Sequence, residues 1–429
     1  MIVWIDATGT AGSPAVFGLG LVERHLHALR MLKPAPTRVV IDLAPGQAKP
    51  ALPDRRLHRL PIEWREDARP FAERCAAAIA AAGGQPVLLL DGATLADPRL
   101  HRTLAERKIP TAVESRDAGE RAGLLLLTGA APSALPDRCT DVSALAHSLV
   151  ETGQVQPLPD DAFTGFVRRL RRTLPYYVFR VDDAARAAKI ERFLFWSNYK
   201  GSTDVFTRYV YPPLVWLMVR PLARLRIHPN WVTLVSILFA LAAVPLWASG
   251  HFISGFVLAY AMSVLDSVDG KLARLTFTDS ELGNYLDHGL DMVHPPLWYV
   301  AWAYGLGIAA EGWDSTLGHA AIAIVACYAL DRVVLKIYPK VFGRAFHTHS
   351  RMDGIVRSFI ARRNISLPIF TVGWLAGLGR EAFYLIVAWQ AATLAYHAGR
   401  TFWILAIERA QHKGPRGPSE VGVKTVGVD

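Results

Sequence analysis

The sequence predicts a chain of two parts, a cytosolic α/β domain followed by an α-helical domain that crosses a membrane several times. Of its 429 residues 52% are hydrophobic, and the mean hydropathy of +0.21 is high for a soluble protein. The apolar residues concentrate in the second half, whereas the first half alternates short apolar runs with helical stretches. We expect an α/β domain over 1–190, a linker with an amphipathic helix over 191–230, a membrane domain over 231–410 and a cytosolic tail over 411–429.

Four apolar runs mark the strands of the first domain: MIVWI, RVVIDL, PVLLLDG and GLLLLTG. Buried parallel strands read as continuous apolar runs of this kind. Stretches such as LVERHLHALRML and FAERCAAAIAAAGG supply the crossover helices between them. The sequence therefore predicts a mostly parallel sheet.

The segment from about 207 to 230, TRYVYPPLVWLMVRPLARLRIHPN, mixes apolar residues with arginines. The arginines are Arg208, Arg220, Arg224 and Arg226. This mixture is typical of an amphipathic helix that lies at a membrane interface.

Six apolar spans follow, at about 231–249, 252–272, 283–308, 316–338, 366–379 and 381–405. The basic residues cluster in alternate connections: Lys340, Arg344, Arg351, Arg357, Arg362 and Arg363 lie between the fourth and fifth spans, and Arg409 and Lys413 follow the sixth. The positive-inside rule then places both termini in the cytosol. We expect a protein that crosses the cytoplasmic (inner) membrane several times.

Charge and cysteine content narrow the function classes. The formal net charge of +10 suits nucleic acid, a membrane surface or an anionic substrate. No zinc-finger spacing or basic run with interleaved aromatics is present, so no nucleic-acid partner is expected.

The chain has three cysteines that lie far apart in sequence, Cys75, Cys139 and Cys327. This spacing argues against a disulfide framework. The N-terminus, MIVWIDATGT, has no positive n-region, and no cleaved signal peptide is expected.

Two stripes of acidic residues are the main candidates for a catalytic site. Asp266, Asp269, Gly270 and Ala273 are spaced i, i+3, i+4 and i+7 at the end of the second span. Gly283, Asp287 and Asp291 are spaced by four at the start of the third. Residues at these spacings share one helix face, so two facing stripes would form one carboxylate cluster.

Four carboxylates in a partly dehydrated site take up protons unless positive charge offsets them. Oxygen-only ligands favour a hard cation, Mg²⁺, with Mn²⁺ or Ca²⁺ as substitutes. Two ions roughly 4 Å apart would suit phosphoryl chemistry. Gly270, Ala273 and Gly283 allow a close approach, and Arg274 can hold phosphate oxygens. The alternative is a set of helix-end aspartates among small packing residues.

The pattern Asp266-x2-Asp269-Gly270-x2-Ala273-Arg274-x8-Gly283-x3-Asp287-x3-Asp291 resembles the signature of the CDP-alcohol phosphotransferase (phosphatidyltransferase) family of membrane enzymes, with similarity over about 195–410. The resemblance implies that an acceptor hydroxyl attacks a CDP-linked donor and CMP leaves. It also implies a homodimer. By the family pattern Asp266, Asp269, Asp287 and Asp291 serve the metal site, Asp291 is also the general base, and Gly270, Ala273, Arg274 and Gly283 shape the CDP-alcohol pocket.

Weaker candidates surround this motif. Asn230 and Thr233 resemble a nucleotide-contacting corner of the family, but a turn and a helix start explain them equally well. Arginines of the 339–365 loop could bind an acceptor phosphate or anionic lipid; they are Arg351, Arg357, Arg362 and Arg363. His288 and His294 could hydrogen-bond to the metal-binding aspartates, or they could be packing residues. Lys200 could reach the site from the linker.

The first domain resembles sugar-nucleotide transferases of the nucleotidyltransferase fold. Its fusion to such a membrane domain resembles bifunctional inositol-phosphate cytidylyltransferase/di-inositol-phosphate phosphate synthase proteins. Those enzymes have a Gly-rich loop with a basic residue and a Lys-Pro pair, whereas this chain reads DATGTAGSPAVFGLG, with Ser13 before Pro14. Ala93 follows Asp91 and Gly92 where a second acidic ligand would stand. We therefore expect a catalytically silent nucleotidyltransferase-like domain that serves assembly, regulation or substrate delivery.

The leading hypothesis is metal-dependent transfer of a phospho-alcohol (phosphatidyl-type) group from a CDP-linked donor to an acceptor alcohol in polar-lipid synthesis, among membrane lipids. An alternative within the enzyme class is transfer from CDP-inositol to a soluble inositol phosphate. An ion-binding membrane transporter is the remote alternative, and the sequence shows no inverted repeat that would favour it.

Overall fold

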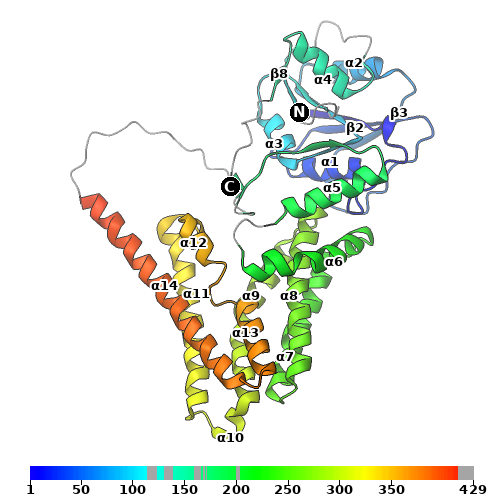
Figure 1. Cartoon of the computed structure of the whole chain (residues 1–429). Coiled ribbons are helices and arrows are strands. Elements are labelled where there is room, and N and C mark those ends of the chain that lie inside the picture. The colour runs from blue at the N-terminus through cyan, green and yellow to red at the C-terminus, as the bar shows by residue number, and fades with distance from the viewer. Residues whose placement is uncertain are drawn as a thin grey trace. The chain divides into compact units, whose positions relative to one another are not determined.

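The computed structural model describes residues 1–113, 123–129, 139–158, 166–167, 170, 172–199 and 203–413 (Figure 1). They divide into two compact units. The first unit comprises Met1–Gly201, Pro212–Thr233 and Leu265–Asn284, and the second comprises Ser202–Tyr211, Leu234–Val264 and Tyr285–Asp429. Three long helices, α7, α8 and α9, therefore have one end in each unit.

A seven-stranded sheet forms the centre of the first unit, in the order β3-β2-β1-β4-β7-β6-β8 (Figure 1). Its strands are β1 (Ile2–Asp6), β2 (Arg38–Leu43), β3 (Ile62–Glu66), β4 (Val87–Asp91), β6 (Thr111–Val113), β7 (Leu124–Leu127) and β8 (Gln156–Pro157). Neighbours are parallel except at β7, which runs antiparallel to β4 and β6. The prediction of a mostly parallel sheet is confirmed. The direction of β7 was not predicted, because an apolar run does not encode strand direction.

Helices cover both faces of this sheet. Helices α1 (Leu21–Arg30) and α3 (Pro98–Glu106) pack on one face, and α2 (Phe71–Ala81) and α4 (Val142–Glu151) pack on the other. The two-residue period of a strand divides its side chains between two cores: Val3 and Ile5 lie in the first and Trp4 in the second. We use "α/β domain" for this sheet and helices α1 to α4.

Smaller elements complete the first unit. Two-residue or three-residue strands pair as β5 (Thr94–Ala96) with β11 (Val178–Arg180) and as β9 (Phe166–Val167) with β10 (Arg172–Thr173). Short 3-10 helices occur at Thr8–Thr10 and Leu57–Arg59. Helix α5 (Ala184–Ser197) precedes α6 (Pro212–Arg224). Helix α6 has exposed Leu214 and Leu217 beside Arg220 and Arg224, as expected of an interfacial helix.

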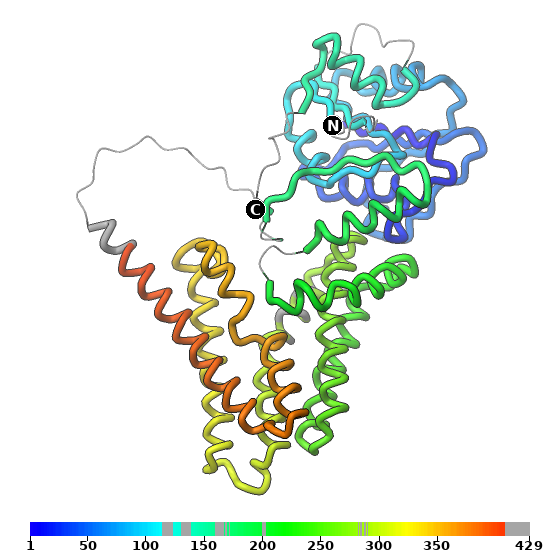
Figure 2. The backbone as a smooth tube through the Cα atoms, viewed as in Figure 1, coloured from blue at the N-terminus to red at the C-terminus, as the bar shows by residue number. Residues whose placement is uncertain are grey.

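The second unit is helical. It contains the larger parts of α7 (Pro229–Ala248), α8 (Phe252–Leu275) and α9 (Glu281–Ala303). It also contains α10 (Ala309–Glu311), α11 (Thr316–Phe342), α12 (Arg351–Val356), α13 (Arg363–Leu375) and α14 (Gly379–Lys413). Shorter turns are π-helical at Phe206–Val210 and Tyr304–Ile308 and 3-10 at Phe346–Thr348. Helix α14 packs along α11 and α13 (Figure 2). The aromatic core of the second unit includes Trp302 stacked on Phe370, with ring centroids 4.3 Å apart.

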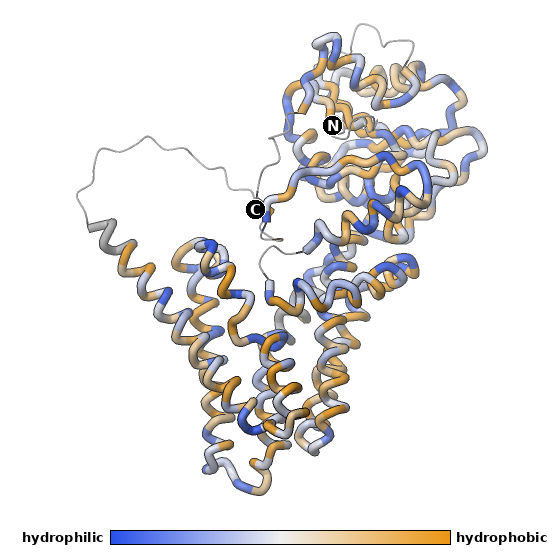
Figure 3. Tube along the Cα trace, in the orientation of Figure 1, coloured by the Kyte–Doolittle hydropathy of each residue, from blue (hydrophilic) through white to orange (hydrophobic). Residues whose placement is uncertain are grey.

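The helices match the predicted spans in position. Among the described residues, α7 and α8 are the two helices that are long and apolar enough to cross a membrane, with window hydropathies of 2.1 and 1.4 (Figure 3). Helices α9 and α11 carry more ionisable residues, and α13 has only 13 residues, fewer than the roughly 20 that a straight span needs. The count of six spans stays a prediction.

Candidate active site

The aspartate stripe of α8 meets the start of α7 within the first unit. Asp269 is buried, and its Oδ2 accepts a hydrogen bond from the Thr233 hydroxyl at 2.6 Å. Thr233 also donates to the carbonyl of Pro229 at 3.2 Å, one turn earlier in α7. Asp266 lies half-buried one turn before Asp269. The structure thus brings together two predicted site residues, Thr233 and Asp269, that are 36 positions apart.

The start of α9 contacts the same end of α7. Ser280 caps α9, since its Oγ accepts from the backbone N–H of Gly283 at 3.0 Å. The same hydroxyl donates to Oδ1 of Asn230 at 3.3 Å. A Cβ on residue 283 would lie 2.8 Å from that Oδ1 and 2.9 Å from Ser280 Oγ. A larger residue at 283 would displace the Asn230 or Ser280 side chain, so glycine suits the close approach of α7 and α9.

Basic side chains of α8 lie beside the stripe. A Cβ built on Gly270 would lie 3.4 Å from a guanidinium nitrogen of Arg274, so Arg274 folds back over the glycine. Ala273 is half-buried beside it. Lys271 is buried, with its ammonium 3.3 Å from the centroid of the Tyr199 ring, a cation–π contact. Sequence reasoning missed Lys271, because a lysine near a helix end is usually solvated.

Two prolines shape α9 at Asp291. Pro295 and Pro296 have no N–H, so the carbonyls of Asp291 and Met292 lose their intrahelical donors. The hydroxyl of Tyr328 on α11 donates to both carbonyls, at 3.0 and 3.4 Å. The backbone that carries Asp291 is thereby fixed by a neighbouring helix of the second unit.

The Asp291 side chain meets Arg363, the first residue of α13. One nitrogen of Arg363 lies 3.2 Å from Asp291 Oδ1 and also 3.2 Å from His294 Nε2. The Asp291 side chain is 52% exposed and that of Arg363 is 10% exposed. The second unit thus unites three predicted candidates: Asp291, His294 and Arg363.

The remaining arginines of the 339–365 loop are more dispersed. Burial strongly lowers the pKa of His347, and the positive charges of Arg357 and Arg362 lower it further. These two guanidiniums therefore lie near one buried imidazole and within six residues of Arg363 in sequence. Arg351 is exposed at the start of α12.

The whole predicted metal site is not assembled from described residues. The Asp287 and His288 side chains and residue Lys200 lie outside the described part of the chain. Within that part, no three His, Cys, Asp or Glu side chains are placed to hold one metal ion. Asp266 and Asp269 offer oxygen ligands at i and i+3, which suits a hard divalent cation. Their convergence with Asp287 and Asp291 stays a prediction.

Sequence reasoning also missed a buried ion pair inside the second unit. Asp331 on α11 and His397 on α14 are fully buried, and His397 Nδ1 contacts Asp331 Oδ1. Arg332 also binds the Asp331 carboxylate, at 2.7 Å. An aspartate within the apolar span at 316–338 was the available signal, because such a residue needs a partner.

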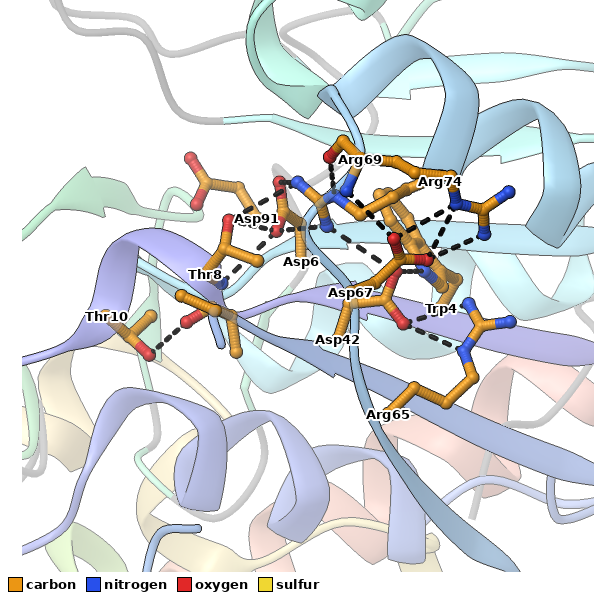
Figure 4. A network of polar contacts seen from close by, with 12 residues as sticks. Trp4, Asp6, Thr8, Thr10, Asp42, Arg65, Asp67, Arg69, Arg74 and Asp91 are labelled. Atoms are coloured by element: carbon orange, nitrogen blue, oxygen red, sulfur yellow. Dashed lines mark hydrogen bonds and ion pairs between the residues drawn. The ribbon is translucent and has the colours of Figure 1, made fainter. Parts of the chain in front are cut away.

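A second acidic group lies at the carboxyl ends of three strands of the α/β domain (Figure 4). Asp42 and Asp91 are the register partners of Asp6 in β2 and β4. This edge of an open α/β sheet is where ligands usually bind. Here the buried guanidinium of Arg74 lies 3.0 Å from Asp6 Oδ1 and 3.4 Å from Asp42 Oδ2.

Further protein groups satisfy the same carboxylates. Trp4 Nε1 donates to Asp42 at 2.9 Å, and Arg65 binds the other oxygen at 2.9 Å. Arg180 lies 3.1 Å from Asp91. Burial raises the pKa of Asp91 to about 6, although the backbone N–H of Ala93 and the charge of Arg180 oppose this shift.

Comparison with known proteins finds similarity in the C-terminal part. Residues 226–398 match the model of the CDP-alcohol phosphatidyltransferase family. An archaetidylinositol phosphate synthase of Aeropyrum pernix is 37% identical over 78 residues, which are 18% of this chain and 40% of the relative. A protein of the same name from Methanothermobacter thermautotrophicus is 31% identical over 106 residues, 24% of this chain and 51% of the relative. The chain thus spans about half or less of these relatives.

A solved structure is also similar. It is a crystal structure of Mycobacterium tuberculosis phosphatidylinositol phosphate synthase (PgsA1) with CDP-DAG bound, at 18% identity and a TM-score of 0.36. The alignment covers 44% of this chain and 94% of that structure.

Proposed function

We propose that the protein transfers a phosphatidyl-type group from a CDP-linked lipid to the hydroxyl of a phosphorylated polyol and releases CMP. The match of residues 226–398 to the CDP-alcohol phosphatidyltransferase family model supports this proposal. The observation that carries the proposal is the position of the eight-residue motif, from Asp266 to Asp291, inside the matched segment. The names of the two synthase relatives support an inositol phosphate as acceptor.

The proposed metal ligands are Asp266, Asp269, Asp287 and Asp291. Two Mg²⁺ ions, or Mn²⁺ in their place, would supply positive charge to the diphosphate of the donor. The Thr233 hydroxyl supports this role, because a hydrogen bond to Asp269 orients the carboxylate as outer-shell partners do. Arg274 would hold phosphate oxygens of the donor with its planar fork.

Asp291 is the proposed general base. Its carboxylate would take the proton of the acceptor hydroxyl. The hydroxyl oxygen would then bond to the phosphorus nearer the lipid. The bond from that phosphorus to the CMP oxygen would break, and CMP would leave. Tyr328 supports this role by fixing the backbone of Asp291. Its side chain is half exposed, so an acceptor from solvent can reach it.

An acceptor phosphate would bind to the arginines near this base. Arg363 contacts Asp291 directly, and Arg357 and Arg362 lie near the buried His347. Guanidinium groups hold phosphate oxygens with two parallel hydrogen bonds. An acceptor held by these groups would present its hydroxyl beside Asp291.

The remaining proposals concern the setting of the reaction. We propose six spans, cytosolic termini and a homodimer in the cytoplasmic membrane, as the charge pattern and the family resemblance imply. The α/β domain is proposed to be catalytically silent. Arg74 supports this, because it fills the space between Asp6 and Asp42 with a protein cation.

The test is CMP release by the purified full chain in lipid vesicles with Mg²⁺. Donors would be CDP-diacylglycerol, CDP-archaeol and CDP-inositol, and acceptors would be inositol, inositol 1-phosphate and glycerol 3-phosphate. We expect release with a CDP-linked lipid and inositol 1-phosphate, and a loss of about 10²–10⁴-fold in Asp291→Asn. If CDP-inositol were the one donor that gave CMP release, the donor assignment would be refuted. Full activity of Asp291→Asn would refute the assignment of Asp291 as the base.

A further inference from the structure

Backbone strain is concentrated where the α/β domain meets the ends of α6 and α8, inside the first unit. Among the described residues, three that are not glycine have positive φ angles: Phe17 at 50°, Arg226 at 54° and Phe277 at 56°. A side chain makes this left-handed conformation unfavourable, so it persists where the surroundings impose it. Each of the three residues contacts a group from another element, and two of these contacts are made by helix α1.

Phe277 ends helix α8, the helix that carries Asp266 and Asp269. The N–H of Thr278 donates to the carbonyl of Ala273 at 3.0 Å, the bond of a Schellman helix end in which the left-handed residue is usually glycine. Here the Phe277 ring instead stacks on the His27 ring, with centroids 5.1 Å apart and planes 3° from parallel. The guanidinium carbon of Arg24 lies 5.7 Å from the Phe277 centroid.

Two arginines of the first 60 residues bind the carbonyls at this helix end. Arg24 donates to the carbonyl of Leu275 at 3.1 Å. Arg56 donates to the carbonyl of Phe277 at 2.9 Å and to that of Asp279 at 3.4 Å. Leu275 is the last residue of α8, and the last carbonyls of a helix carry partial negative charge without partners in the helix, so the Arg24 contact is favourable. The two carbonyls that Arg56 binds lie in the turn that follows the helix.

The end of α6 is held in the same manner. Arg226 donates its N–H to the carbonyl of Ala223 at 3.0 Å, and Ile227 donates to Leu222 at 2.9 Å, which completes a second Schellman end. The Arg226 guanidinium makes two bonds of 2.9 Å to the buried carboxylate of Glu23, the neighbour of Arg24 on α1. One turn of α1 therefore contacts the ends of both α6 and α8.

We propose that Arg24 and Arg56 are positioning residues of the transferase. By holding the carbonyls of 275, 277 and 279, they fix the turn between the aspartate stripe of α8 and Gly283 at the start of α9. This inference rests on the proposed function for its catalytic meaning. It gives the catalytically silent α/β domain a role, which is to set the geometry of the motif that binds the donor.

The test compares Arg56→Gln with Arg55→Gln in the full chain. Arg55 is the exposed neighbour of Arg56, so the control changes the same charge on the same surface. We expect amide hydrogen exchange in residues 276–284 to become about tenfold faster in Arg56→Gln only, because opening this turn becomes easier. Unchanged exchange there would overturn the proposal.

Activity supplies a second readout. The Mg²⁺ concentration for half-maximal CMP release should rise several-fold in Arg56→Gln, while the unfolding temperature of the α/β domain stays that of Arg55→Gln. Arg56→Lys should restore most of the Mg²⁺ response, since an ammonium also donates to carbonyls. A uniform loss of activity and unfolding temperature in Arg56→Gln would show a purely structural role and overturn the proposal.

The variant Phe277→Gly separates the effect of backbone strain at residue 277 from the effect of the Arg56 contact. Glycine adopts positive φ freely, so in this background Arg56→Gln should accelerate exchange by a clearly smaller factor than in the native chain. An equal factor would contradict the role assigned to the strained turn. If the native chain released no CMP with any donor, the proposed function would fail, whereas the exchange measurements would still decide whether Arg56 holds the turn.

Discussion

The two acidic groups of the molecule differ in how their charge is satisfied. In the α/β domain Asp6 and Asp42 are buried at the ends of adjacent parallel strands, and Arg74 lies between them. On α8 Asp269 is equally buried, but the contacts that position it include a neutral hydroxyl, that of Thr233. The first group is a closed ion-pair network, whereas the second keeps the donor set that a divalent cation prefers.

Acidic residues at a favourable edge of a sheet can be paired with cations of the protein itself. The carboxyl end of a parallel sheet is where α/β proteins usually bind ligands, and the aspartates of β1, β2 and β4 occupy that edge in register. The cation that they need is already supplied by the protein. The charge of Asp6 and Asp42 is thus balanced by Arg74 within the protein itself.

The largest expected effect is on the closed network. Arg74→Met should destabilise the α/β domain by about 3–5 kcal/mol, because it leaves two buried carboxylates without their shared cation. Thermal unfolding of the full chain would measure this loss. Adding Asp6→Asn and Asp42→Asn to Arg74→Met should restore much of the stability. A stable Arg74→Met would mean that another cation holds the two aspartates, and the contrast with α8 would then disappear.

A somewhat smaller effect is expected at the α8 stripe. Asp269→Asn should lower CMP release about 10²-fold, or about 2.7 kcal/mol, since the site loses a charged ligand for the cation. The unfolding temperature should change little, because Asn can still accept from Thr233. Asp314→Asn, at an exposed loop position, is the matched control. If the two variants released CMP equally fast, Asp269 would have a structural role, like Asp6 and Asp42.

Much of this architecture could be predicted from sequence patterns. The four apolar runs became β1, β2, β4 and β7, because buried strands need continuous apolar residues. The i, i+3 spacing correctly placed Asp266 and Asp269 on one helix. The direction of β7 could not be predicted, since direction depends on how the chain returns to the sheet.

Contacts between distant segments were beyond the sequence patterns. Nothing in the run around Arg74 indicates that it lies between two aspartates from other strands. The stack of His27 on Phe277 joins residues 250 positions apart, and no periodicity relates them. For Gly283 the pattern indicated a close approach, but only the structure identified Asn230 as the group that approaches.

The smallest expected effect concerns a pair of buried histidines, which are neutral, in contrast to the charged groups above. His25 and His101 are buried in the α/β domain, with His25 Nδ1 2.9 Å from His101 Nε2. Burial lowers the pKa of His25 to about 4 and that of His101 to about 3. The unfolded chain binds protons at these positions below about pH 6.5, whereas the folded domain does not bind them until the lower values are reached. Each histidine therefore reduces stability as pH falls through this window.

His101→Gln isolates one of these protons, because an amide can hydrogen-bond to His25 without titrating near neutral pH. Between pH 6 and 4 the variant should lose about 1.4 kcal/mol less per pH unit than the native chain. Asp91, whose pKa is raised to about 6, gains stability on acidification in both proteins, so its contribution cancels from the difference. His147→Gln, at an exposed position, should follow the native curve. If both variants followed the native curve, the folded domain would have to protonate His101 at an ordinary pH, and the interior around it would be far more polar than the burial of this pair implies.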